Sequence, residues 1–290
     1  MGVVQQFNAL FWSWSEMLRA LRRRVALGPF WVYAGAQVAA LLMLLGFTVR
    51  PFSLFVPSLL KWSFGTEALH YPNNLIAMRA AMGQLDIVLS VVLGALVTAS
   101  AVHIFSAFYG GERESFVAGW REGAARYAPA LAVAIVVSLI AQLVVRVPMT
   151  VWGGLADTSP LKYRLLRVVL IGAVLVVQAL FVYAIPAVVI DTKRVGSALG
   201  SSMAIALRSP ITTGLIIGVP AALELLPAWI MRNSAVIVYR FSPEFLTFGM
   251  FLWIAVIFLM NYATIGAATR FYLHATQMDE PVNGREEEER

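Results

Sequence analysis

The chain has 290 residues, of which 60% are hydrophobic and only 13% are charged, and its mean hydropathy is +0.77. Soluble domains are about 45–50% apolar and about 25% charged, so this composition excludes a soluble globular protein and makes lipid part of the solvent. The net charge of +6 fits basic residues beside anionic lipid head groups rather than nucleic-acid binding, and the absence of cysteine excludes disulfides and thiolate sites.

The first predicted element is an amphipathic helix over residues 3–24. Apolar residues recur at every third or fourth position from Val3 to Leu21, and a basic cluster, Arg22–Arg24, ends the segment. This pattern is typical of a helix that lies in a membrane interface. A short helix packed on a helical bundle has the same pattern, so both interpretations stay open.

Six apolar stretches are long enough to cross a bilayer as helices, because a hydrocarbon core about 30 Å thick needs about 20 residues. The predicted spans are 30–49, 85–109, 128–149, 166–190, 211–231 and 247–270. These unbroken apolar runs lack the short alternating segments of a membrane β-barrel. The predicted fold class is therefore all-α, a polytopic transmembrane helical bundle over 1–277, and the acidic tail over 278–290 is predicted to be disordered.

Two more amphipathic segments, 113–127 and 195–207, come directly before the third and fifth spans. An offset of 81 residues places four residues on identical ones: Arg113 on Arg194, Gly119 on Gly200, Ala125 on Ala206 and Pro129 on Pro210. The N-terminus follows the same order, with Gly28-Pro29 before the first span. We predict a threefold internal repeat of an amphipathic helix followed by a helical hairpin.

Basic residues near the span ends indicate the orientation of the chain. If the amphipathic segments share one side of the membrane, that side carries eleven basic residues and the other side nine. Because basic residues are enriched in cytoplasmic loops, we expect both termini to be cytoplasmic.

Sequence motifs for catalysis or metal binding are absent. The three histidines lie far apart, and there is no His-Glu-x-x-His pair, no phosphate-binding Gly-Lys-Ser/Thr loop and no Gly-x-Ser-x-Gly motif. We therefore predict a non-enzymatic protein without catalytic residues, cofactor or metal.

Ionisable residues inside the predicted spans are the best candidates for a functional site, because a charge in lipid is costly unless it is paired or hydrated. Glu224 and Arg146 both fall in the outer third of their spans and can pair, and Asp86 is a second candidate partner for Arg146. The alternatives are a salt bridge that holds helices together, a substrate or proton site, and side chains that reach the interface. His103 fits either a proton relay or a hydrogen bond to a neighbouring helix.

Small residues in the fifth span form the motif Gly214-x-x-x-Gly218. Glycines at this spacing let two helices approach closely, although the motif also occurs by chance. Gly214 and Gly218 are therefore candidate helix-packing residues.

One region resembles a known group of proteins. The stretch from Tyr183 to Asp191, followed by Val195-Gly-Ser-Ala-Leu199 and Ser201-Ser202, is similar to poorly characterised bacterial six-helix membrane proteins. That group includes the membrane domain attached to some glycerophosphoryl diester phosphodiesterases. The resemblance implies a six-helix bundle in a bacterial cytoplasmic membrane, and it transfers no catalytic residue, because the phosphodiesterase activity belongs to a separate soluble domain.

The predicted function is a structural or accessory role in the membrane. Expected partners are membrane lipids, a membrane protein or a second copy of the chain. The alternative is a small permease for a lipid-like or hydrophobic substrate, with Glu224, Arg146 and His103 near its path.

Overall fold

The computed structural model describes residues 2–154 and 159–279, which form helices and contain no β-strand. The helices, in chain order, are α1 (Val3–Ala20), α2 (Arg24–Leu45), η1 (Phe52–Leu54), α3 (Val56–Phe64), η2 (Thr66–Leu69), α4 (Asn73–Tyr109), α5 (Phe116–Ala125), α6 (Tyr127–Trp152), α8 (Pro160–Phe181), α9 (Ala184–Val189), α10 (Val195–Arg208), α11 (Pro210–Leu223), α12 (Leu225–Arg232), α13 (Ser234–Arg240) and α14 (Phe245–Asp279). The all-helical fold class is confirmed for this part of the chain. The predicted tail begins inside α14, and residues 280–290 lie outside the described residues.

Five helices are long and apolar enough to cross a membrane, and a sixth is reached if the bent pair α10–α11 counts as one span. They are Arg24–Leu45, Asn73–Tyr109, Tyr127–Trp152, Pro160–Val189 and Phe245–Thr276. Length and composition are thus compatible with a multi-pass membrane protein. α4 begins twelve residues before the predicted second span (85–109), because Leu75, Met78 and Met82 continue its buried face.

The predicted fifth span, 211–231, is two helices instead of one. α11 ends at Leu223 and α12 begins at Leu225, so Glu224 occupies the break. Proline has no amide hydrogen and its ring crowds the preceding turn. Pro220 in α11 and Pro227 in α12 therefore weaken the backbone hydrogen bonding on both sides of Glu224.

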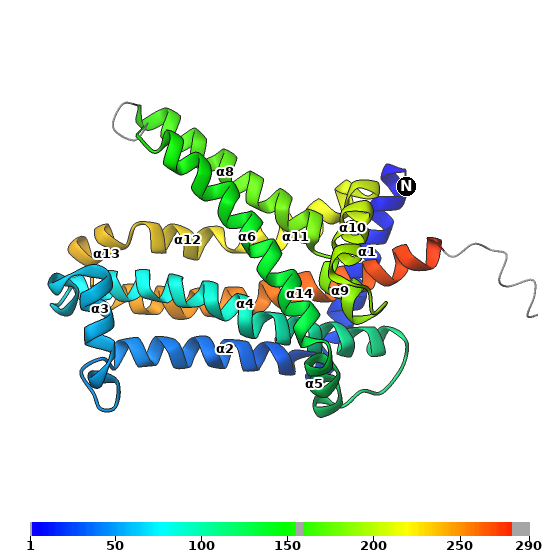
Figure 1. The fold of residues 1–290 in the computed structure, drawn as a ribbon, viewed down its shortest axis with the longest axis horizontal. Coiled ribbons are helices and arrows are strands. Elements are labelled where there is room, and N and C mark those ends of the chain that lie inside the picture. Colours follow the sequence, from blue (N-terminus) through cyan, green and yellow to red (C-terminus); the bar gives the residue numbers. More distant parts are fainter. Residues whose placement is uncertain (1, 155–158, 280–290) are drawn as a thin grey trace, which may run out of the picture.

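The long helices lie side by side and define two ends of the molecule (Figure 1). α2, α4 and α14 contact one another, and α11 and α12 line up along α14. The short helices α1, α5 and α10 gather at one end, which we call the terminal end, and α3 and α13 lie at the other, which we call the loop end.

The interior is packed in separate clusters along the bundle. Toward the loop end, Leu41, Leu44, Leu60, Met78 and Leu246 are fully buried. Toward the terminal end, aromatic rings meet edge to face, with Phe30 and Tyr262 centred 5.5 Å apart. In a membrane, lipid tails are as apolar as the side chains, so the hydrophobic effect does not drive helices together. Dense van der Waals packing of this kind holds them together instead.

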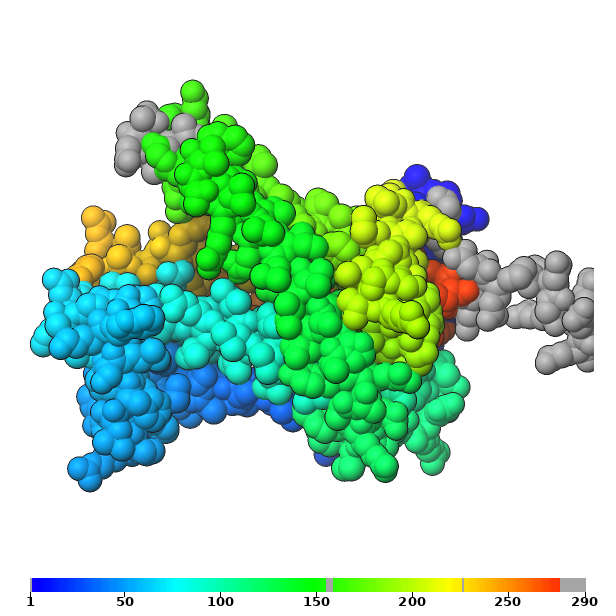
Figure 2. All heavy atoms as spheres, in the orientation of Figure 1, coloured from blue at the N-terminus to red at the C-terminus, as the bar shows by residue number. Residues whose placement is uncertain are grey.

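The α6–α8 hairpin leans away from the other helices toward the loop end (Figure 1). It packs on α4, α9, α10 and α11, and a smaller share of its side chains is buried than in α2 or α4. Figure 2 shows the loop-end half of the hairpin standing clear of the rest of the molecule. One flank of the hairpin therefore faces a groove rather than a packed neighbour.

Glycines bring α5 onto α4. A Cβ at Gly119 would lie 2.3 Å from Ile104 Cγ1, and a Cβ at Gly123 would lie 2.1 Å from Ser100 Oγ. The candidate packing residues Gly214 and Gly218, by contrast, have no atom within 4 Å of an added Cβ. They do not bring two of the described helices together, because α11 buries a different face that includes Thr213 and Ile217.

The N-terminal helix α1 packs one face on the bundle and exposes the other, and its position in a membrane interface stays a prediction. Ser13, Met17 and Ala20 are buried against the bundle, whereas Phe7 and Phe11 are exposed. α1 is tied to α11 by Gln6, whose side-chain oxygen accepts the Ile211 N–H at 3.0 Å and whose carbonyl oxygen accepts the Thr212 hydroxyl at 2.9 Å.

Candidate functional site

Asp86 lies on α4, where α2 and α14 converge on it. Gln37 Nε2 donates a hydrogen bond to Asp86 Oδ1 at 2.5 Å, and the Tyr33 hydroxyl donates to the same oxygen at 3.4 Å. The indole N–H of Trp253 on α14 also faces this carboxylate. Neutral donors thus hold the half-buried carboxylate in place, and they leave its negative charge uncompensated.

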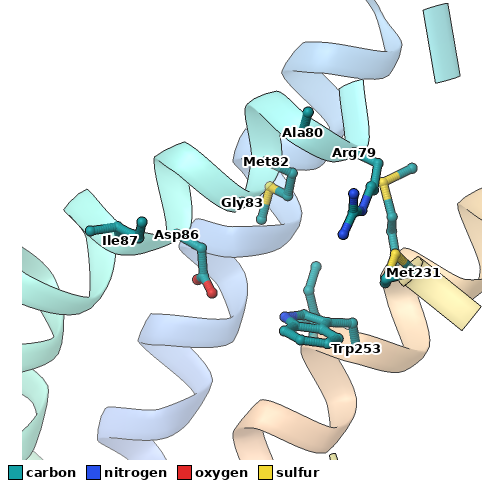
Figure 3. A pocket seen from close by; sticks show the side chains of 10 residues that line it. Arg79, Ala80, Met82, Gly83, Asp86, Ile87, Met231 and Trp253 are labelled. Atoms are coloured by element: carbon teal, nitrogen blue, oxygen red, sulfur yellow. The ribbon is translucent and has the colours of Figure 1, made fainter. Parts of the chain in front are cut away.

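A cavity of about 400 Å³ opens beside Asp86, and we call it the α4 cavity. Its walls include Arg79 and Gly83 from α4, Met231 from α12 and Trp253 from α14. Figure 3 shows the Arg79 guanidinium and the Asp86 carboxylate directed into the same space, with the Trp253 ring on its far wall. Arg79 and Asp86 are seven residues apart, which is about 10.5 Å along a helix.

A second cavity, of about 490 Å³, lies between the leaning hairpin and the broken α11–α12 segment, and we call it the hairpin cavity. Glu224 lines it from the helix break, and the other polar residues around it are Arg167, Gln178 and Arg232. Its apolar walls come from α6, α8 and α14, and they comprise Val145, Met149, Leu170, Ile171, Val174, Leu175 and Met260. The cavity combines an apolar slot with two arginines and one carboxylate. The Arg167 guanidinium also donates to the Tyr163 hydroxyl at 2.6 Å and lies over the Tyr163 ring.

The expected pairing of Arg146 with Glu224 or Asp86 is not formed. The ion pairs among the described residues are Arg19–Glu16, His103–Glu114 and Lys193–Asp191. Arg146 is exposed on α6, on a different side from its neighbour Val145, which lines the hairpin cavity. Similar depth in two helices does not ensure contact, since the rotation of each helix decides which way its side chains point.

The arginines that do share a cavity with Glu224 were not singled out from the sequence. Arg167 is the second residue of the predicted fourth span, and Arg232 directly follows the predicted fifth span, so both counted only toward orientation. The sign of such a role in the sequence is that both arginines lie at the border of a long apolar run. Only the lean of the hairpin brings them to one cavity.

His103 lies toward the terminal end, far along α4 from Asp86. Its Nε2 is 3.6 Å from Glu114 Oε2, in the segment that precedes α5. A cavity of about 300 Å³ beside it is lined by Glu122, Arg126 and Thr192. The structure therefore places His103 apart from Glu224 and Asp86, with a carboxylate as its neighbour.

The polar side chains that line the two cavities can bind charged groups. Among the residues that the structure describes, no group of three or more histidine and carboxylate side chains is placed to hold a metal ion. What the two cavities present is guanidinium at Arg79, Arg167 and Arg232 and carboxylate at Asp86 and Glu224. Such groups recognise charged head groups, while the apolar walls suit hydrocarbon.

Comparison of the chain with protein-family models, with curated proteins and with solved structures found no match.

Proposed function

We propose that this protein is a multi-pass integral membrane protein that binds an amphipathic lipid in the hairpin cavity and serves a non-enzymatic, accessory role. The apolar composition and the long apolar helices support the membrane location. The single observation that carries the lipid is the hairpin cavity, in which Glu224, Arg167 and Arg232 face a slot with apolar walls.

The proposed placement has six spans, with α11 and α12 together as the fifth, and the terminal end on the cytoplasmic side. The order of elements supports a threefold repeat, because a short helix precedes α2, α6 and α11 in turn. A bacterial cytoplasmic membrane remains the expectation that the family resemblance implies. Membrane lipids, a membrane protein or a second copy of the chain remain the expected partners. In this placement both cavities lie in the outer half of the membrane.

A lipid explains why charged groups sit in an otherwise apolar slot. Carboxylates and guanidinium groups at membrane depth are costly unless they are paired or hydrated, and Glu224 forms none of the ion pairs found among the described residues. Arginine binds phosphate through two parallel hydrogen bonds. A lipid would place its head group at Arg167 and Arg232 and its chains along α6 and α8.

The test blocks the apolar part of the hairpin cavity and leaves Glu224, Arg167 and Arg232 unchanged. Val174→Trp places a large ring in the hairpin cavity, whereas Val169→Trp adds the same ring on the exposed side of α8. Mass spectrometry of protein purified in mild detergent should find several-fold less bound lipid with Val174→Trp and an unchanged amount with Val169→Trp. Equal lipid content in the two variants, both folded, would refute the proposed site.

The second candidate function is a permease for a lipid-like substrate, and the helix break at Glu224 favours it, because discontinuous helices often form transporter sites. Reconstituted protein and a fluorescent phospholipid test it by the rate of transfer between leaflets. A permease predicts transfer that Glu224→Gln slows while bound lipid is retained. Binding without any transfer would leave the accessory role.

A further inference from the structure

We propose that the α4 cavity is a second lipid site, specific for a head group that carries a phosphate and a primary ammonium group, as in an ethanolamine phospholipid. This inference extends the proposed lipid binding to a separate cavity on the other side of α12. The two cavities lie on either side of α12: Met231 lines the α4 cavity, and the next residue, Arg232, lines the hairpin cavity.

Asp86 supplies the ammonium end of the site. Its carboxylate faces neutral donors, from Gln37, Tyr33 and Trp253, and takes part in none of the ion pairs found in the described part of the chain. A carboxylate that lines a cavity and has no cationic partner favours a cation that carries N–H donors, and a primary ammonium carries three.

Arg79 supplies the phosphate end. Its side chain is half-buried, points into the cavity and is likewise outside the described ion pairs. A planar guanidinium is suited to phosphate because two of its N–H groups meet two phosphate oxygens. Arg79 and Asp86 lie about two helical turns apart, about 10.5 Å between their backbone positions, so their side chains can bind the two ends of one head group in the same cavity.

The remaining walls suit the rest of such a molecule. Trp253 presents an aromatic ring beside Asp86, where an ammonium group gains cation–π attraction. Met82 and Met231 give an adaptable apolar lining. Gly83 leaves an opening in the α4 wall, since a Cβ built there has no atom within 4 Å.

The charges also discriminate among phospholipids. A choline head group has the positive charge but no N–H to donate to Asp86. A glycerol head group has the phosphate but no cation, and it leaves the carboxylate uncompensated. An ethanolamine head group alone among the three satisfies both Arg79 and Asp86.

The experiment compares phosphatidylethanolamine, phosphatidylcholine and phosphatidylglycerol, each added to delipidated full-length protein in micelles and followed by native mass spectrometry. We expect phosphatidylethanolamine to bind at least tenfold more tightly than the other two. Asp86→Asn should remove this preference, and Arg79→Ala should weaken binding of phosphatidylethanolamine. Equal affinity for the three lipids, or an undiminished preference in Asp86→Asn, would overturn the proposal.

A blocking variant keeps the test valid if Asp86→Asn folds poorly. Gly83→Leu places an apolar side chain at the opening, where its Cβ has no atom within 4 Å, and Gln84→Leu adds the same side chain at an exposed neighbour that does not line the cavity. The preference for phosphatidylethanolamine should be lost in Gly83→Leu and kept in Gln84→Leu. If both variants keep this preference, the proposal is contradicted. If Val174→Trp reduces bound lipid but the protein shows no head-group preference, only the α4 site is refuted. If the protein binds no lipid at all, the proposed function is refuted as well.

Discussion

At the scale of single residues, the carboxylates Glu224 and Asp86 face cavities instead of forming ion pairs within the described residues. Glu224 shares its cavity with Arg167 and Arg232, and Asp86 shares the other with Arg79. Each carboxylate therefore lies in a space that also holds guanidinium, without forming an ion pair in the described residues. An arrangement of this kind leaves both charges available to a ligand that carries the opposite charges.

A residue-scale prediction concerns the link between Tyr71 and Glu244 outside the apolar helices. The Tyr71 hydroxyl donates to Glu244 Oε1 at 2.8 Å. The pKa of Glu244 is lowered because the Ser242 hydroxyl and then the backbone and Tyr71 donate to its carboxylate. A lowered folded-state pKa means that the link stabilises the folded loop end above the unfolded pKa and is lost as the pH falls through the folded pKa.

Hydrogen-exchange protection factors of the backbone over residues 242–248 measure this effect. They should be lower at about pH 3 than at pH 7, since glutamate titrates near pH 4. Tyr71→Phe should lower them at pH 7 and reduce the dependence on pH. Tyr239→Phe, which removes a neighbouring hydrogen bond to Asn73, is the control and should leave the pH dependence intact; a pH-independent wild type contradicts the prediction.

At the scale of elements, prolines and glycines decide how the helices end and meet. Pro220 and Pro227 flank the break that exposes Glu224 between α11 and α12. Gly119 and Gly123 let α5 lie directly on α4. The two prolines in the sequence indicate this break. Which of the motifs Gly119-x-x-x-Gly123 and Gly214-x-x-x-Gly218 brings two helices into contact depends on which helix faces are buried, and the sequence does not give this.

Alanine substitution of these glycines gives the element-scale prediction. Gly123→Ala should destabilise the protein by about 1–3 kcal/mol, as overpacking typically does, because its Cβ meets Ser100 backbone atoms at 2.6–2.7 Å. Gly214→Ala has open space and should be neutral or slightly stabilising, since alanine favours a helix by about 1 kcal/mol over glycine. Thermal unfolding in detergent measures both, and equal stability of the two variants contradicts the assignment of the contact.

At the scale of the whole molecule, the lean of the hairpin creates the larger cavity. α6 and α8 pack on neighbours at α9, α10 and α11 and separate from the other helices toward the loop end (Figure 1). A parallel arrangement of the same helices would close the space in front of Glu224. The cavity is thus a property of how the hairpin is docked, and no single helix contains it.

The molecular-scale prediction is the orientation of the two ends. The chain has no native cysteine, so single cysteines at exposed serines report location directly. Ser58→Cys on α3 should react with a membrane-impermeant maleimide from outside intact cells. Ser197→Cys on α10 should react only after permeabilisation, and reaction of both from the same side would contradict the proposed topology.

The sequence by itself determined the helical class and the approximate position of five of the six predicted apolar spans, whereas the predicted fifth span is broken at Glu224. Apolar runs of about 20 residues and helical periodicity carry this information locally. Only the tertiary structure decided which of the charged residues share a cavity: Glu224 with Arg167 and Arg232, and Asp86 with Arg79. The physical reason is that periodicity sets where a side chain lies along its own helix, whereas the tilt and rotation of one helix against another come from packing between segments far apart in the chain.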